Sequence, residues 1–272
     1  MKTWQIGCYT RPWGAYDYRV AFDAIAEAGF PYVGLMSANS KTKLVLTPAN
    51  TAEESSQIGE EARKRDLKVI STYGGGLPVA KSLQAGVDWL RKLVDNCALA
   101  GSPSILLAGI NKPALEESYY QAIAECCDYA ADKQVQLILK PHGPLNATGR
   151  ECRQRVEKVG HSNFRIWYDP GNVYTYSNGE IDPALDVEAV VGLVTGMCIK
   201  DYQHVPKTVN VTPGAGQVDF AAVLAHLRSD DFSGFTHGPL VVETLTLGTP
   251  QELIREARKA REFIQQLTGQ KQ

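Results

Sequence analysis

The sequence predicts a closed (β/α)8 barrel, a fold in which eight parallel strands are each followed by a helix. Short apolar runs alternate with longer stretches of helical period, and this alternation occurs eight times within 272 residues. The apolar runs have few polar residues on either face, as is typical of strands buried in a parallel sheet. A doubly wound open sheet is the alternative. It is disfavoured because "GCYTRPWG", and no GxGxxG loop, follows the first strand.

The eight apolar runs are taken in order as strands, each with a helix candidate after it. They span residues 3–9, 32–36, 67–72, 104–109, 135–140, 164–169, 193–200 and 239–245. No linker rich in Pro, Ser or Gly interrupts the series, so residues 1–272 are expected to form one domain. The segment 37–50 is too long for a tight turn and is predicted to be a loop over the barrel mouth.

Several helices carry start signals that do not depend on the apolar pattern. A Thr with a Glu three residues later has the spacing of a capping box, in which each residue bonds the other's backbone N–H. Proline is favoured at the first helical position. The capping-box pairs are Thr51 with Glu54, Thr148 with Glu151 and Thr249 with Glu252, and the prolines are Pro183 and Pro250.

Composition excludes several classes of protein. Hydrophobic residues make up 44% and charged residues 21% of the chain, with a formal net charge of −2. The chain therefore lacks the broad basic surface of a nucleic-acid-binding protein. An uninterrupted apolar stretch of about 18 residues is missing, as is a secretion signal at the start, so a cytoplasmic location and no membrane association are expected. Six cysteines without a CxxC pair indicate reduced, buried thiols, and a homo-oligomer remains compatible with the sequence.

The active site of such a barrel lies at the C-terminal ends of its strands. Side chains alternate along a strand, so Lys140 and His142 should share one face, as should Cys198 and Lys200. If Lys140, Asp169, Cys198 and Glu243 point inward, the last four strands each supply one reactive residue to a common centre. The polar residues at the strand ends are Arg11, Tyr73, Lys140, His142, Asp169, Asn172, Lys200, Asp201, His204 and Glu243.

Six segments together give the chain a resemblance to a known family over essentially its whole length. They are "AEAGFPYVGL", "LILKPHG", "WYDPGN", "CIKD", "PGAGQVDF" and "PLVVET". Their order and spacing resemble those of the xylose-isomerase-like TIM barrels, the sugar phosphate isomerases/epimerases. The loop PGAGQVDF followed by a glutamate at the end of the last strand is the most characteristic part.

The resemblance implies a divalent metal, Mn, Mg or Zn, held by Glu, Asp, His and Glu on strands 5 to 8. Asp169 and Glu243 match two of these positions, and Lys200 and Asp201 match the rest of the strand 7 motif. Lys140 stands where the family has glutamate, and Cys198 stands where it has histidine. Exchanging a carboxylate for an ammonium adds two positive charges, the charge of the absent ion. We therefore expect no tightly bound cofactor, with the Lys140 ammonium between Asp169 and Glu243.

Three other interpretations of these residues stay open. Asp169, Glu243, His142 and Cys198 could form a residual metal site, since oxygen, imidazole and thiolate ligands suit zinc or manganese. Lys140 could form a Schiff base with a substrate carbonyl. The charged residues could also be an ion cluster that only holds the barrel together.

The function expected from the resemblance is a sugar or keto-sugar isomerase or epimerase, with a sugar phosphate as one candidate substrate. Proton transfer next to a carbonyl would involve Glu243, Lys140 and His142 as catalytic residues. The expected substrate-binding residues are Arg11, Tyr73, Asn172, Lys200, Asp201 and His204. The alternatives are a lyase or hydrolase acting on a carbonyl-activated glycoside, and a sugar-binding barrel without catalysis. A zinc-dependent abasic-site endonuclease is disfavoured, because five histidines and a slightly acidic chain do not suit a three-metal cluster or DNA.

Overall fold

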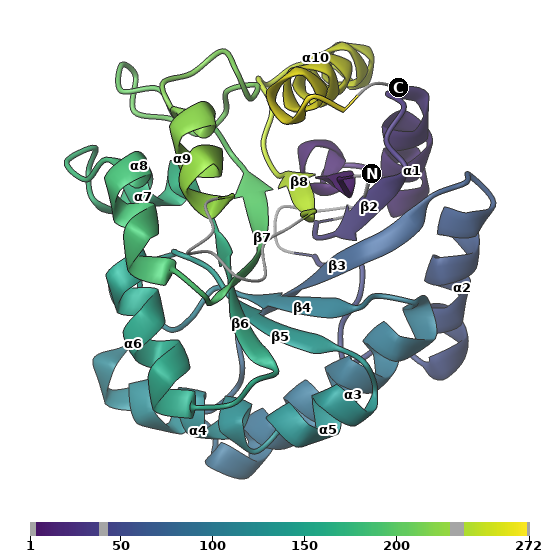
Figure 1. Ribbon diagram of the computed structural model, residues 1–272. Coiled ribbons are helices and arrows are strands. Elements are labelled where there is room, and N and C mark those ends of the chain that lie inside the picture. Colours follow the sequence, from purple (N-terminus) through teal and green to yellow (C-terminus); the bar gives the residue numbers. More distant parts are fainter. Residues whose placement is uncertain (1–3, 38–42, 229–236, 271–272) are drawn as a thin grey trace.

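Eight parallel strands close into a barrel in the computed structural model, which describes residues 4–37, 43–228 and 237–270 (Figure 1). Each strand pairs with the next one along the chain, and the last pairs with the first at Ile6↔Leu240 and Cys8↔Val242. The predicted barrel is confirmed. The strands are β1 (Ile6–Tyr9), β2 (Tyr32–Leu35), β3 (Lys68–Gly75), β4 (Ser104–Leu107), β5 (Gln136–Leu139), β6 (Phe164–Tyr168), β7 (Val194–Ile199) and β8 (Leu240–Val242).

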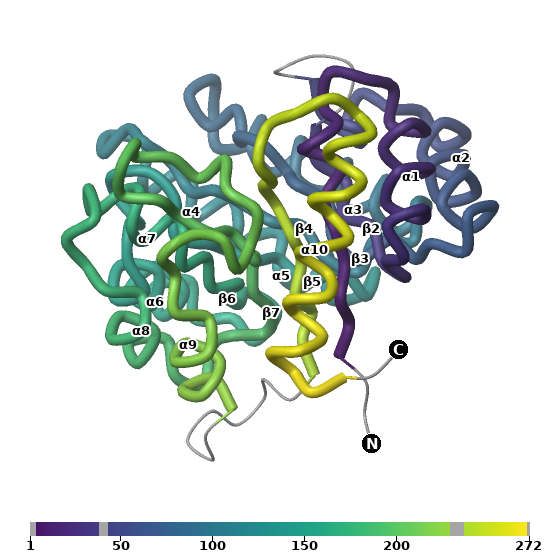
Figure 2. Tube along the Cα trace, turned by 90° about the horizontal axis from the view of Figure 1, so that it is seen from above, coloured from purple at the N-terminus to yellow at the C-terminus, as the bar shows by residue number. Residues whose placement is uncertain are grey.

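Helices surround the barrel, with α10 lying beside α1 (Figure 2). All three predicted capping boxes are present, and Pro183 and Pro250 stand at helix starts. The helices are α1 (Tyr18–Glu27), α2 (Ala52–Arg63), α3 (Leu83–Ala100), α4 (Glu116–Ala124), α5 (Cys127–Asp132), α6 (Gly149–Val159), α7 (Pro170–Tyr176), α8 (Pro183–Asp186), α9 (Phe220–Leu227) and α10 (Pro250–Thr268). The described part of the chain also contains the short 3₁₀ helices η1 (Arg11–Trp13), η2 (Pro113–Leu115) and η3 (Val187–Val190).

An apolar layer fills the inside of the barrel and sets the direction of the residues above it. The layer contains Tyr9, Met36, Ile70, Leu106, Ile138, Trp167, Cys198 and Val241. Side chains two residues apart on a strand point to the same side. Lys140, Asp169, Lys200 and Glu243 each stand two residues after a member of this layer and directly follow β5, β6, β7 and β8. The alternation therefore aims all four charged side chains into the mouth of the barrel.

The predicted loop after β2 doubles back on itself at its base. Ser37 and Leu44 form an antiparallel bridge, and the Val45 backbone N–H donates to the Met36 carbonyl at 3.0 Å. Residues 38–42 of this predicted loop lie outside the described residues. No helix in the described part of the chain combines the length and apolarity needed to cross a bilayer.

Candidate active site

Four charged side chains form a closed ring of alternating sign at the barrel mouth. Lys140 Nζ lies 3.1 Å from Asp169 Oδ2 and 2.6 Å from Glu243 Oε2. Lys200 Nζ lies 3.0 Å from the same Asp169 oxygen and 2.7 Å from Glu243 Oε1. Each carboxylate thus bridges both ammonium groups. All four side chains are at most 2% exposed, so the ring is withdrawn from water.

The segment WYDPGN fixes two members of the ring. Asp169 caps α7, because its Oδ1 accepts the Asn172 backbone N–H at 3.0 Å and leaves Oδ2 for the lysines. Pro170 takes the first helical position. A Cβ on Gly171 would come within 2.6 Å of the Lys200 carbonyl oxygen, so only glycine lets α7 approach β7 this closely.

Asn172 links the ring to the loop after β5. Its side-chain Nδ2 donates to the Pro141 carbonyl at 2.8 Å, and its Oδ1 accepts from Lys200 at 3.0 Å. The Lys140 carbonyl is held in turn by Asn146 Nδ2 at 2.8 Å. The backbone on either side of the ring is therefore fixed by side-chain amides, which keeps the lysines in place.

Burial and charge act against each other in the ring. Burial disfavours the charged form of Lys140, but Glu243 and Asp169 outweigh it and raise its pKa well above the ordinary value. For Lys200, burial outweighs the same two carboxylates and lowers the pKa. Burial alone would raise the pKa of Glu243, yet Lys140, Lys200 and Arg11 hold that pKa well below its usual range. Glu243 is therefore ionised at neutral pH and can accept a proton.

Arg11 adds a third cation at the entrance to the ring. It follows β1 in η1, and its Nη1 lies 2.5 Å from Glu243 Oε1. The side chain of Arg11 is 39% exposed, whereas that of Glu243 is 1% exposed. Arg11 therefore connects the buried ring to solvent.

His142 and two tyrosines border the same mouth. His142 Nε2 lies 3.0 Å from the Tyr176 hydroxyl, and burial together with Lys140 and Lys200 lowers the His142 pKa to about 3. The imidazole is therefore neutral at physiological pH. Tyr73 is buried enough to raise its pKa, and the charges that act on it come from Lys140, Glu243 and Arg11. Both predicted residues thus lie close to the ring.

Asp201 and His204, two predicted substrate-binding residues, are engaged elsewhere. The Asp201 carboxylate accepts four backbone N–H groups at 2.8 to 3.0 Å, from Tyr202, Gly214, Gly216 and Val218. It thereby shapes the loop PGAGQVDF. The His204 ring packs edge-on against the rings of Tyr174 and Tyr202, each 5.0 Å away between centroids.

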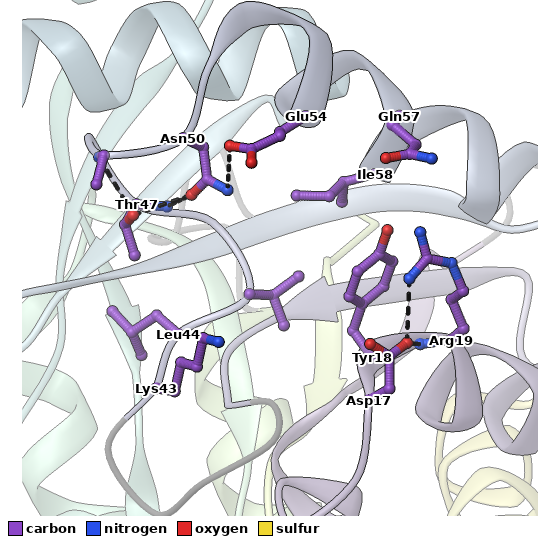
Figure 3. A pocket seen from close by; sticks show the side chains of 12 residues that line it. Asp17, Tyr18, Arg19, Lys43, Leu44, Thr47, Asn50, Glu54, Gln57 and Ile58 are labelled. Atoms are coloured by element: carbon purple, nitrogen blue, oxygen red, sulfur yellow. Dashed lines mark hydrogen bonds and ion pairs between the residues drawn. The ribbon is translucent and has the colours of Figure 1, made fainter.

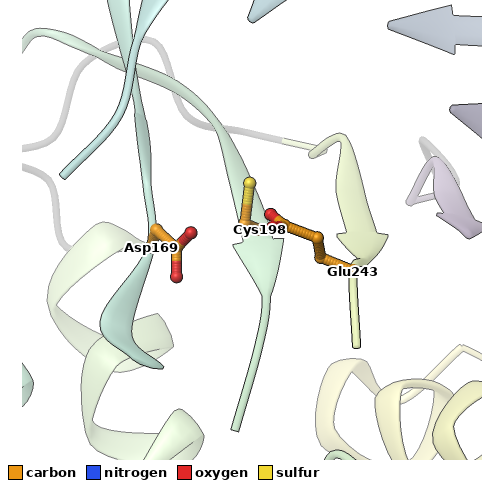
Figure 4. A group of neighbouring side chains, drawn as sticks. All are labelled: Asp169, Cys198 and Glu243. Carbon is orange, nitrogen blue, oxygen red and sulfur yellow. The ribbon is translucent and has the colours of Figure 1, made fainter. Parts of the chain in front are cut away.

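The carboxylates do not offer the arrangement that a divalent ion requires. Asp169, Cys198 and Glu243 point toward one another from three neighbouring strands, with ligand atoms within 4.8 Å (Figure 4). However, every oxygen of Asp169 and Glu243 already accepts from an ammonium, a guanidinium or a backbone N–H. Burial also raises the pKa of the Cys198 thiol well above its usual value, which disfavours the thiolate that binds metals. This donor set fits two ammonium groups and not a divalent cation.

A separate pocket of about 550 Å³ lies at the start of α1 and α2 (Figure 3). Tyr18 and Arg19 face Gln57 and Ile58 across it, and Thr47 and Asn50 bond each other at its rim. None of the ring residues lines this pocket. This pocket is therefore not assigned to the site formed by the ring.

Lys200 is more central than the sequence alone suggested. The sequence predicts a substrate-binding role for it, whereas in the structure it contacts both carboxylates directly. Cys198, expected at the centre of the site, belongs to the apolar layer below the ring. The sequence does contain a signal for this difference. Cys198 and Lys200 share one face of the strand, and of two such residues the one nearer the C-terminal end of the strand lies closer to the mouth. The Tyr176 contact with His142 had no signal in the sequence.

The comparisons with known proteins agree on the architecture. The family model described as "Xylose isomerase-like TIM barrel" matches residues 22–267. D-psicose 3-epimerase with D-tagatose from Clostridium cellulolyticum H10 superimposes with a TM-score of 0.73 at 15% identity, covering 97% of this chain and 99% of that one. D-allulose 3-epimerase from Methylomonas sp. in complex with D-allulose gives 0.72 at 20% identity, covering 98% of each chain.

A third solved structure with the same fold is that of a protein described as a dehydratase and not as an epimerase. It is "the probable 3-DHS dehydratase AsbF" from Bacillus anthracis, with a TM-score of 0.70 at 14% identity, covering 96% of this chain and 99% of that one. None of the curated proteins compared matches the sequence. At these identities the likeness to solved structures shows the fold alone.

Proposed function

Because the chain belongs to the xylose isomerase-like TIM barrel family, we propose that it catalyses proton transfer next to the carbonyl group of a keto-sugar, as an isomerase or epimerase. The single observation that carries this proposal is the buried ring of Lys140, Asp169, Lys200 and Glu243 at the C-terminal ends of β5 to β8. That end of the barrel is where active sites of this fold lie. Solved ketose 3-epimerases with the same fold add support.

The ring supplies both a base that accepts the proton and positive charge that stabilises the carbonyl oxygen. Removing a proton from the carbon beside a carbonyl leaves an electron pair that moves to the carbonyl oxygen, so negative charge develops there. Two ammonium groups already placed in a dry site stabilise that charge without reorganisation. Lys140 and Lys200 are those groups. The carboxylate between them, Glu243, is ionised and accepts the proton.

Substrate entry also improves Glu243 as a base. In the free protein three cations share its two oxygens, which makes the carboxylate a weak proton acceptor. A substrate oxygen that accepts hydrogen bonds from Lys140 and Lys200 draws these ammonium groups away from Glu243, and its pKa then rises. The proton returns either to the opposite face of the same carbon, giving an epimer, or to the neighbouring carbon, giving an isomer. Glu243 itself returns the proton when the product is an isomer. For an epimer, neutral His142 at the same mouth is the proposed relay: one ring nitrogen gives its proton to the carbon as the other takes one from water, and the proton on Glu243 neutralises the hydroxide that remains.

Lys140 is proposed to occupy the electrostatic role that a divalent ion has in the resemblance described above, because Lys200 already belongs to the family's strand 7 motif. An ammonium in place of the family's glutamate adds two positive charges, the charge of one such ion, and Lys140 contacts the two carboxylates that match its ligands. Ammonium groups differ from a metal in donating directional hydrogen bonds, so the substrate oxygen must lie in line with their N–H bonds. The proposal therefore requires no bound cofactor.

Elimination is the second candidate reaction, because it begins with the same proton removal and one structure of this fold is described as a probable dehydratase. Incubation with ketohexoses in deuterium oxide, followed by NMR, separates the two. Deuterium on carbon with the molecular formula of the sugar retained supports isomerisation or epimerisation. Loss of water or of a sugar group supports elimination, and binding without exchange leaves a sugar-binding barrel. The matched control is Lys92→Gln, which changes an exposed lysine.

A further inference from the structure

Three cations share two carboxylates in the ion-paired cluster at the barrel mouth, counting the described residues. The two ammonium groups and two carboxylates of the ring sum to zero. The Arg11 guanidinium therefore leaves one positive charge in excess at the entrance.

No described carboxylate other than Glu243 lies within ion-pair distance of Arg11. Glu243 itself is shared with Lys140 and Lys200, so it does not neutralise the guanidinium. The charges acting on Tyr73, which borders the same mouth, are again those of Lys140, Glu243 and Arg11, with no further acid among them. Within the described residues, the third cation of this cluster therefore has no carboxylate of its own.

The position of Arg11 is fixed while its side chain remains available to a ligand. Trp13 in the same 3₁₀ turn is fully buried, and its backbone N–H donates to the Thr10 carbonyl at 3.0 Å. Thr10 Oγ1 in turn accepts the Met36 N–H at 3.0 Å. A guanidinium carries five N–H donors in a planar fork that matches a carboxylate. One of these reaches Glu243, and the exposed side of the group faces solvent.

We propose that the sugar bound at this site is a keto acid whose carboxylate pairs with Arg11 while its carbonyl reaches the lysine ring. This inference rests on the proposed function for the keto-sugar part and on the charge balance for the acid. One surplus positive charge matches one carboxylate. A phosphate monoester carries about −1.5 to −2 at neutral pH and would leave negative charge in excess. A neutral ketose would leave the guanidinium unpaired.

Three six-carbon probes that differ in charge test the proposal. They are D-fructose, 5-keto-D-gluconate and D-fructose 6-phosphate, and their affinities are measured by titration calorimetry on the wild-type protein. We expect the keto acid to bind at least tenfold more tightly than D-fructose. Arg11→Gln should weaken keto acid binding about tenfold to hundredfold, the loss expected for a hydrogen-bonded charged group, and change D-fructose binding less than twofold. Arg19→Gln, at a half-buried arginine paired with Asp17 and Glu61 away from the ring, should leave both affinities unchanged.

Three outcomes overturn the proposal: equal affinity for keto acid and D-fructose, equal weakening of both by Arg11→Gln, or Arg11-dependent binding that is tightest for the phosphate. Thermal melting of Arg11→Gln shows whether the variant is folded, and Arg11→Lys, which keeps the charge but not the fork, should retain part of the preference. Arg11-dependent binding of the keto acid without deuterium exchange removes the proposed function but keeps the anion site. Deuterium exchange into D-fructose without tighter binding of the keto acid keeps the proposed function and removes the anion site.

Discussion

Lys140 Nζ lies 2.6 Å from Glu243 Oε2, and the two residues are 103 positions apart in the chain. This contact joins the ends of β5 and β8 across the barrel mouth, in a region where neither side chain is more than 1% exposed. An ion pair that is buried this deeply needs its geometry to be exact to offset the desolvation of both groups. The pair also lies at the end of the barrel where active sites of this fold lie. The same two side chains are therefore expected to affect both the stability of the protein and the proposed reaction.

Removing one member of this pair should lower the free energy of unfolding. Lys140→Met leaves Asp169 and Glu243 short of a cation in a buried site, so the free energy of unfolding should fall by about 3–5 kcal/mol. Urea titration followed by circular dichroism measures it. Lys140→Met combined with Glu243→Met replaces the pair with apolar side chains and should recover most of the loss. If the double variant also retains full turnover, the ring is only a stabilising cluster.

Glu243→Gln should lower turnover by about 10² to 10⁴, because the amide keeps the shape of the side chain but cannot accept a proton. The measurement is the rate of solvent deuterium incorporation into a sugar that the wild-type protein converts. Binding of that sugar should change far less than turnover. Near-normal exchange in Glu243→Gln would place the base elsewhere.

The purified protein should keep its activity in the presence of a chelator. The ammonium groups of Lys140 and Lys200 hold the oxygens that a divalent ion would need, so EDTA removes nothing that the reaction uses. Elemental analysis of the chain tests this directly. About one zinc or manganese per chain, together with loss of activity on chelation, contradicts the proposal.

The combined change Lys140→Glu with Cys198→His should create measurable divalent-metal binding. It supplies the ligand types that the family resemblance implies and takes one ammonium out of the ring. Calorimetric titration with Mn²⁺ measures the new site, and Lys140→Gln with Cys198→Ser serves as the matched control without new ligands. Equal metal binding by both variants would mean that these positions are not equivalent to the ligand positions of the family.

His142 should make the protein less stable as the pH falls. Its pKa is about 3 in the folded chain and near 6.5 when unfolded, so between these values the unfolded chain binds a proton that the folded chain does not. The free energy of unfolding should therefore decrease on acidification below about pH 6.5, by at most about 1.4 kcal/mol per pH unit from this group. Urea titrations at pH 6 and pH 5 should show a smaller decrease in His142→Gln than in the wild type. Equal decreases would show that the imidazole is not held neutral.

Strand and helix positions were predictable because continuous apolar runs and period-3.6 patterns report local burial directly, and the closed barrel was predictable because the alternation occurs eight times. The helix starts were predictable for a similar reason, since the Thr249 capping box involves residues only three positions apart. The ring was predictable in part. Alternation along a strand indicates which way Lys140 and Lys200 face, but the distance between Lys200 and Glu243 depends on how β7 and β8 align, and that register is a long-range property. Asp201 shows the same limit, because its four backbone donors belong to a loop whose path the sequence does not state.

The alternating ring also constrains how this protein can change. Because each carboxylate bridges both lysines, replacing one charged member by a neutral residue leaves one uncompensated charge inside the barrel, and reversing its sign leaves two. Substitutions made one at a time therefore pass through unstable intermediates, whereas paired substitutions keep the sum at zero. Directed evolution of a new specificity should therefore vary ring positions in opposite-charge pairs. Alternatively it can leave the ring unchanged and vary Arg11 at the entrance, because this side chain is 39% exposed and solvent screens a change in its charge.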